Sequence, residues 1–419
     1  MTGHRIGNWY FGWTIVAAAA FLTLLTVGMR MGIGPFFLPI ADDLGFSRSM
    51  LAGMVAVGML CYGLAMPLAG YLVAARGTRF VLLTGMTIVV ASTIATVQAT
   101  GPLAFFLAFG VGQSIGLGLT SPVALTPILA RWFVRRRGMA LFFLSTGSMA
   151  GIALMTPIFT ALISWLGWRS AMLVFAAAFA LFTVPAALLI FRDQAPPEAD
   201  LGPEEAARRA RVTQAAPAGA DLRVRDALVS WPFWQIALGL FTCGFSMNLL
   251  GSHGVPMLMD HGFDPMTSSL GIGLIGAVAV FSTLVLGRLS DVLPRRNILA
   301  AIYLVRGLGF FALVMVGVQW ELYTAAAIGG IVWAGSIALS SAILADLYGV
   351  RLVGVLYGWA YLGHQFGGMI SSWLGGWGYE TFGTHWVSFG MAGALLVGAA
   401  AVSMRLPRRP VAFAAPAPG

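Results

Sequence analysis

An arginine at position 30 lies within a run of apolar residues that begins near Tyr10, in the stretch LTVGMRMGIG. A charged side chain near the centre of a membrane helix costs about 2.5–3.5 kcal/mol on insertion scales. Acidic residues stand only near the ends of the apolar runs or in a charged central segment. A desolvated guanidinium is well matched by a carboxylate, which it binds through two parallel hydrogen bonds. The sequence therefore indicates Arg30 as the binding residue for an organic anion, and the alternative is a buried link to another helix.

Two later apolar runs carry polar side chains at helical spacing. In SMNLLGSHGVP, Asn248 lies one turn before Ser252, and His253 follows; in YGWAYLGHQFGG, Tyr361, His364 and Gln365 lie close together on the helix surface. Histidine titrates near physiological pH. We expect His253 and His364 to donate to a bound carboxylate or to carry a coupled proton, although a buried histidine is more often structural.

Further polar residues of the apolar runs are expected to line the same cavity. They are Gln113 and Thr120 in the fourth run and Trp333, Ser336 and Ser340 in the tenth. The alternative for the serines is hydrogen bonding between helices.

The elements that position these residues are membrane helices. The chain has 419 residues, of which 59% are hydrophobic and 9% charged, a composition outside the range of soluble domains. About 20 residues cross a bilayer. Twelve spans are predicted, at 10–33, 50–73, 80–98, 102–130, 137–163, 168–191, 232–259, 267–290, 297–317, 322–345, 352–377 and 385–405.

Charge placement predicts the topology. All 24 basic residues are arginines, and most follow alternate spans, as the positive-inside rule requires if both termini are cytoplasmic. The net charge of +9 is then a topological signal, and no nucleic acid partner is expected. Cys61 and Cys243 lie in separate predicted spans and suggest neither a disulfide framework nor a metal site. We expect a multi-pass protein of the bacterial cytoplasmic (inner) membrane, without a cleaved signal peptide.

The two halves of the chain repeat. Adding 217 to the residue number takes Pro39 to Pro256 and Asp43 to Asp260, and the same offset holds without a gap over some forty residues. Parallel repeats are typical of two six-helix bundles that rock about a central site. The predicted domains are an N-terminal bundle at 1–191, a charged cytoplasmic linker at 192–230, and a C-terminal bundle with a short tail at 231–419.

The segment GRLSDVLPRR at 287–296 resembles the loop signature of the major facilitator superfamily. This resemblance implies an all-α fold of twelve helices in two bundles with pseudo-twofold symmetry, in which the first, fourth, seventh and tenth helices line the cavity. It implies gating roles for Asp291, Arg295 and Arg296 at the inner face. The first-half copy has Ala74 where the aspartate is expected. It also places Arg306, in the ninth span, on a supporting helix, where it would bond backbone or a neighbouring helix.

Two stretches resemble the monocarboxylate transporter and oxalate–formate exchanger group. They are NWYFGWTIVAAAAF at 8–21 and RWFVRRRGMALFFLSTGSMAG at 131–151. The sequence departs from that group at 267–286, where charged residues are expected and none is found. A single fixed positive charge favours a monoanion over a dicarboxylate.

The predicted function is secondary active transport of small organic anions, most simply monocarboxylates, by alternating access with proton symport or anion exchange. We expect no enzyme activity, no cofactor and no metal, and a transporter that functions as a monomer. Two alternatives stay open, a multidrug or metabolite exporter of the same fold and a non-transporting membrane sensor.

Overall fold

The computed structural model describes residues 5–6, 9–195, 224–349 and 352–407, and nearly all of them are helical. Two short strands, β1 (Arg5–Ile6) and β2 (Trp9–Tyr10), pair before the first helix. The first half consists of α1 (Gly12–Met31), α2 (Gly34–Leu44), α3 (Arg48–Arg76), α4 (Thr78–Gln98), α5 (Pro102–Phe105), the π-helical η1 (Phe106–Gln113), α6 (Ser114–Leu119), α7 (Pro122–Trp132), α8 (Arg137–Pro185) and η2 (Ala186–Ile190). The second half consists of α10 (Val224–Val229), α11 (Trp231–Asp260), α12 (Pro265–Val292), α13 (Arg295–Met315), α14 (Gln319–Ile331), α15 (Gly335–Tyr348), α16 (Val353–Phe382), η3 (Trp386–Gly390) and α17 (Met391–Met404).

The helices agree with the twelve predicted spans. Ten helical segments among the described residues are long and apolar enough to cross a membrane. One of them, Gly138–Ile190, contains two predicted spans, which Gly167 separates with a positive φ of 76°. The helix α16 corresponds to the remaining span at 352–377. The structure is therefore the expected all-α membrane fold.

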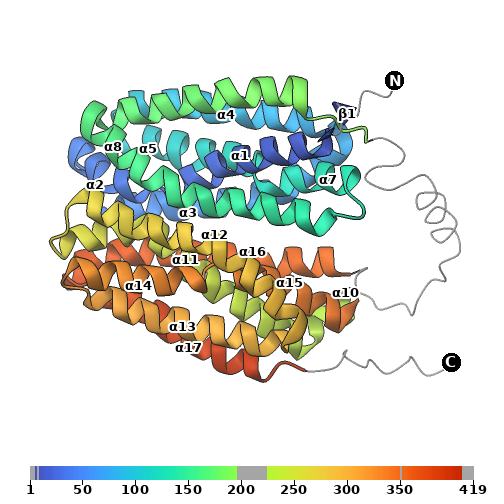
Figure 1. Cartoon of the computed structure of the whole chain (residues 1–419). Helices are drawn as coiled ribbons and strands as arrows, with labels where there is room; N and C mark the ends of the chain where they lie inside the picture. The colour runs from blue at the N-terminus through green and yellow to red at the C-terminus, as the bar shows by residue number, and fades with distance from the viewer. Residues whose placement is uncertain (1–4, 7–8, 196–223, 350–351, 408–419) are drawn as a thin grey trace, which may run out of the picture.

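The helices form two bundles with separate apolar cores. One core is built almost entirely from α1–α8 and the other largely from α11–α17. Figure 1 shows the blue-to-green helices above the yellow-to-red ones, with β1 and the last turn of α17 at the same end of the bundles. We call this the terminal end, and the opposite one the far end. Most of the predicted linker, 196–223, and the tail from residue 408 lie outside the described residues, so the exact domain bounds stay a prediction.

The bundles meet from mid-depth to the far end. There, backbone of α8 lies so close to α12 that a Cβ atom at Gly276 would be 2.7 Å from the carbonyl oxygen of Met149. A side chain at Gly376 of α16 would likewise meet the backbone of Arg48 in α3. These contacts close the far end.

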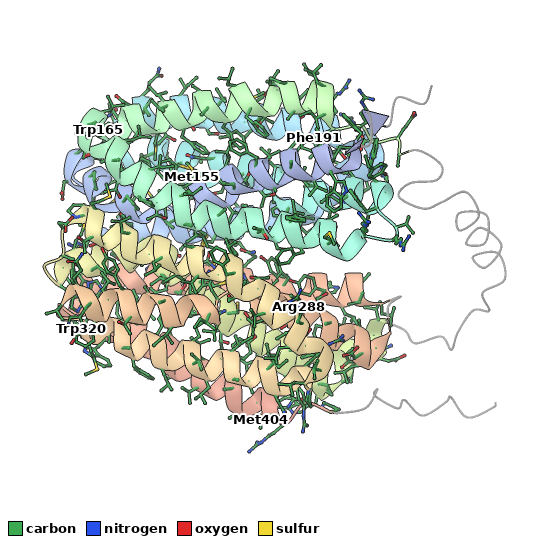
Figure 2. The ribbon with its side chains drawn as sticks, viewed as in Figure 1. Met155, Trp165, Phe191, Arg288, Trp320 and Met404 are labelled. Atoms are coloured by element: carbon green, nitrogen blue, oxygen red, sulfur yellow. The ribbon has the colours of Figure 1, made fainter. Side chains whose placement is uncertain are left out.

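Exposed tryptophans mark the far end. Figure 2 places Trp165 and Trp320 at this end of the two bundles, and their side chains are 80% and 68% exposed. Indole rings favour the boundary between hydrocarbon and headgroups, so this end lies at one membrane surface.

Three helices break within or just after predicted spans. The first ends at Met31, and the chain continues from Gly34 as α2, which ends at Leu44 before Gly45 with a φ of 65°. The fourth span breaks between Leu119 and Pro122, and the tenth breaks between Ile331 and Gly335. Freed backbone groups inside a membrane need partners, and polar side chains lie near these breaks.

Candidate functional site

Arg30 lies in the last turn of α1 and is bonded across the bundle interface. Its Nη2 donates to Oδ1 of Asn248 in α11 at 2.8 Å and to Oε1 of Gln365 in α16 at 3.2 Å. The guanidinium also lies over the ring of Tyr62 in α3, 4.2 Å from the centroid. No carboxylate pairs with Arg30 among the described residues. The site therefore keeps an uncompensated positive charge on neutral partners.

A small cavity adjoins this arginine within the N-terminal bundle. Its volume is about 40 Å³, and its polar lining comes from Arg30, Tyr62, Gln113 and Ser114. The rest of the lining is apolar and includes Met29. By this measure one water needs about 10–15 Å³, so the cavity accommodates only a few non-hydrogen atoms.

Several buried donors around the cavity have no acceptor. They are Nε of Arg30, Nε2 of Gln113 and Nε2 of Gln365, and Oε1 of Gln113 also has no partner among the described residues. A buried donor left unsatisfied costs about 1–3 kcal/mol. A ligand that carries acceptor oxygens would satisfy these donors, whereas an apolar ligand would not.

The aromatic and imidazole side chains of α16 form a stack beside this region. The rings of Tyr361 and His364 are nearly parallel, with centroids 4.7 Å apart. His364 is fully buried, and neither of its ring nitrogens has a partner among the described residues. Both ring nitrogens of His364 are therefore available for a hydrogen bond to a ligand.

Of the predicted site residues, Arg30 and Gln113 line the cavity, and Asn248 and Gln365 are joined to it through Arg30, whereas His253 and Trp333 do neither. The ring of His253 packs on Phe37, with centroids 4.8 Å apart, and against Gly375, while its Nδ1 contacts Ser252 Oγ at 2.8 Å. Trp333 lies at the break of the tenth span. The structure brings Arg30, Asn248, Gln365 and Gln113 together and places these two elsewhere.

Arg306 has the structural environment expected of a supporting helix. It is 1% exposed, and its Nη2 donates to the carbonyl oxygens of Val332, at 2.6 Å, and Trp333. Its other contacts are Ser336 Oγ at 3.3 Å and Cys243 Sγ at 3.3 Å. Arg306 thereby satisfies carbonyl groups freed where the tenth span breaks.

The predicted gating residues lie at the terminal end. Arg295 pairs with Asp346 at 2.7 Å, and Arg296 donates to the carbonyl oxygen of Leu406 at 2.7 Å. Both contacts lie within the C-terminal half. The side chain of Asp291 is outside the described part of the structure.

Asp193 caps the helix that follows the first-half copy of the loop, in which Ala74 replaces the expected aspartate. Its carboxylate accepts from the backbone N–H of Thr78 at 2.9 Å and from the Thr78 hydroxyl at 2.6 Å, at the start of α4. Arg131 adds a weaker contact at 3.4 Å. The sequence interpretation did not identify Asp193, although an acidic residue directly after an apolar run is a usable signal.

Tyr62 was also not predicted. It is one of two tyrosines, with Tyr71, in a 29-residue helix, and only its mid-span depth, matching that of Arg30, could have identified it.

A sequence model of the Major Facilitator Superfamily matches residues 19–322 and 255–419. The chain is 25% identical over 375 residues to the uncharacterized MFS-type transporter YcxA of Bacillus subtilis, covering 85% of this chain and 86% of that protein. It is 28% identical to human monocarboxylate transporter 11, covering 96% and 84%, and 23% identical to rat monocarboxylate transporter 13, covering 96% and 90%.

A solved structure has the same fold. It is that of a bacterial homolog to the human lysosomal transporter Spinster, in an inward-facing and occupied conformation. The TM-score is 0.67 at 18% identity, over 96% of this chain and 95% of that one.

Proposed function

Because this chain belongs to the major facilitator superfamily and is a transporter rather than an enzyme, we propose that its substrates are small organic monoanions, above all monocarboxylates. The transport mode we propose is alternating access with proton symport or anion exchange. The observation that carries this proposal is the charge of Arg30, held by neutral amides beside a cavity with unfilled donors. The two monocarboxylate transporters among its relatives support the same substrate class.

In the proposed bound state, the carboxylate takes the place of the two amide oxygens on Arg30. An ionised acceptor forms stronger hydrogen bonds than an amide carbonyl does. Gln365 could then turn its free Nε2 toward the same carboxylate, since it has no other acceptor among the described residues. Gln113 and Tyr62 would hold the body of the ligand in the cavity.

Binding at Arg30 would also loosen the contact between the bundles. Arg30 is on the N-terminal half, whereas Asn248 and Gln365 are on the C-terminal half. A ligand that replaces these bonds exchanges an interbundle contact for a contact with itself. The ligand therefore shifts the equilibrium between the two bundle arrangements only as far as its binding free energy differs between them.

We propose His364 as the proton carrier, with Tyr361 holding its ring by stacking. His364 directly precedes Gln365 in the chain, and its ring stacks on Tyr361. The ring of His253 is instead enclosed by Phe37 and Gly375. We also propose a role for His253 in proton coupling, through its packing within α11.

The proposed orientation places the terminal end in the cytoplasm and the far end outside. Both termini and the loop with Arg295 and Arg296 then lie inside, in agreement with the positive-inside rule. We propose the bacterial inner membrane as the location and a monomer as the functional unit.

The test is thermal stabilisation of the purified protein by a panel of monocarboxylates, dicarboxylates, neutral solutes and organic cations. A ligand that binds the folded state raises the unfolding midpoint by mass action. We expect stabilisation by particular monocarboxylates and its loss in Arg30→Gln, together with loss of uptake into proteoliposomes. The matched control is Arg169→Gln, because Arg169 is an exposed arginine paired with Asp43 at the far end. Stabilisation by cations or neutral solutes alone, equal in Arg30→Gln, would refute the anion assignment and favour an exporter.

A further inference from the structure

An ion pair joins the two bundles at the far end. Arg48, at the start of α3, donates from Nη1 and Nη2 to the carboxylate of Asp260 at the end of α11, at 2.6 and 3.0 Å. The Arg48 guanidinium also lies over the ring of Tyr379, 4.4 Å from its centroid. Next to it, the backbone N–H of Ser49 donates to Glu380 at 3.1 Å. We call the Arg48–Asp260 pair the outer lock, because opening the far end must break it.

A histidine shares the carboxylate of the outer lock. Nε2 of His385 lies 2.9 Å from Oδ2 of Asp260, the same oxygen that Nη1 of Arg48 contacts. His385 belongs to the segment between α16 and η3, so it moves with Asp260 in the C-terminal bundle. Its ring stacks on Tyr379, with centroids 4.3 Å apart. Arg48 and His385 therefore compete for one anion.

The second ring nitrogen of His385 has no partner. Nδ1 is buried and unbonded among the described residues. His385 lines a cavity of about 250 Å³ at the far end, together with Asp260, His261, Thr384 and Tyr379. With Nε2 donating to Asp260, Nδ1 carries a free lone pair, so a proton arriving through water in this cavity would bind there.

We propose that Nδ1 of His385 is a proton-binding site of the outer lock, and that a proton bound there favours the state in which the far end is open. In the closed state, a protonated His385 would place two cations on the single carboxylate of Asp260. When the far end opens, Arg48 leaves with the N-terminal bundle and Asp260 pairs with the imidazolium alone. Opening therefore makes protonation of His385 more favourable, and by reciprocity the proton favours opening.

The other groups that face His385 strengthen this bias in the closed state. Among the described residues they are Asp260 and His261 from α11, Arg48 from α3, and Tyr379 from α16. Burial lowers the pKa of His385 below its ordinary value, and the charges of His261 and Arg48 act in the same direction, whereas Asp260 raises it. The closed lock thus favours the neutral imidazole, and departure of Arg48 with entry of water removes two of the causes that lower its pKa.

His261 is a natural control. Its Nδ1 lies 2.7 Å from the carbonyl oxygen of Met257 and its Nε2 lies 3.1 Å from that of Val314. Both partners belong to the C-terminal bundle, so rocking of the bundles leaves them in place. The two contacts of His261 are therefore expected to be the same in both states.

The experiment measures the opening of the far end against pH in the full chain. Spin labels at Ala104→Cys and Val318→Cys, both exposed at the far end of opposite bundles, report the distance between the bundles in a Cys61→Ser background. Lowering the pH from 8 to 5 should increase the population with a long distance. The ratio of open to closed molecules should rise up to about tenfold for each unit by which the pKa of His385 differs between the states.

The His385→Gln variant keeps a neutral donor toward Asp260 at every pH. Its far end should stay closed at pH 8, and the pH response should disappear, whereas His261→Gln should retain a pH response. His385→Lys, which is charged throughout, should be open already at pH 8. Retention of the wild-type response in His385→Gln, or closure of the far end by acid, would overturn the proposal. These distances need no substrate, so the result is independent of the proposed monocarboxylate specificity.

Discussion

Replacing Arg306 by methionine is expected to destabilise the protein more than the same replacement of an exposed arginine does. Arg306 satisfies the carbonyl groups of Val332 and Trp333 where the tenth span breaks. Leaving a buried acceptor unsatisfied costs about 1–3 kcal/mol, so two acceptors correspond to roughly 2–6 kcal/mol. Methionine also removes the cost of burying a charge, so we expect a loss in the lower part of that range, about 2–4 kcal/mol.

The assay is thermal unfolding of the purified protein in detergent. For a cooperative unit the size of one bundle, each kcal/mol lowers the midpoint by about 2–4 °C, so Arg306→Met should unfold at least about 4 °C below the wild type. Arg169→Met is the matched control, because a partly exposed ion pair contributes only about 0–1 kcal/mol. Equal midpoints for Arg306→Met and the wild type would refute the assigned capping of the broken helix.

Two further predictions concern the closed far end and a helix cap. Gly276→Val should prevent closure, because its Cβ atom would lie 2.6 Å from the backbone nitrogen of Ala153. A clash that costs more than about 1.4 kcal/mol should lower uptake at least about tenfold. The control is Gly309→Val, which has open space around it and should transport normally. Asp264 caps α12 by accepting from the backbone N–H groups of Met266 and Thr267, so Asp264→Ala should cost about 1 kcal/mol at pH 7. Hydrogen bonds from Thr267 lower the pKa of Asp264, so this stabilisation is present at neutral pH and is lost as the pH falls through the lowered pKa. The free energies of unfolding of the wild type and the variant, measured with a chemical denaturant, should therefore become equal in acid. A difference that persists in acid would contradict the cap.

Hydropathy alone was sufficient to predict the helical spans, because each must cross the same apolar thickness. It did not predict the breaks after Met31 and after Ile331. An interruption of two or three residues leaves the mean hydropathy of a span unchanged. The sequence indication was indirect: Arg30 and Arg306 are charged residues within apolar spans, and in the structure each lies beside one of these breaks.

The sequence indicated the partners of Arg30 as unusual residues one by one, but it did not predict that they contact Arg30. Asn248 and Gln365 stood out as amides in apolar runs, yet they are separated from Arg30 by 218 and 335 residues in sequence. Helical periodicity determines which residues share a face of one helix, and it carries no information about the neighbouring helix. The same limit applies to His253, whose spacing fits a cavity face although its ring packs on Phe37.

The two intramembrane arginines therefore differ by the nature of their partners. Arg306 is bonded by backbone carbonyls of its own bundle, which do not separate when the bundles rock. Arg30 is bonded by side-chain amides of the opposite bundle, and those contacts must change if the bundles rock as proposed. A charge with fixed partners stabilises one fold, whereas a charge whose partners leave must find a new acceptor or return to the same amides. The second behaviour is the one that the proposed binding role of Arg30 requires, and under that proposal ligand exchange at Arg30 and movement of the bundles are two aspects of one step.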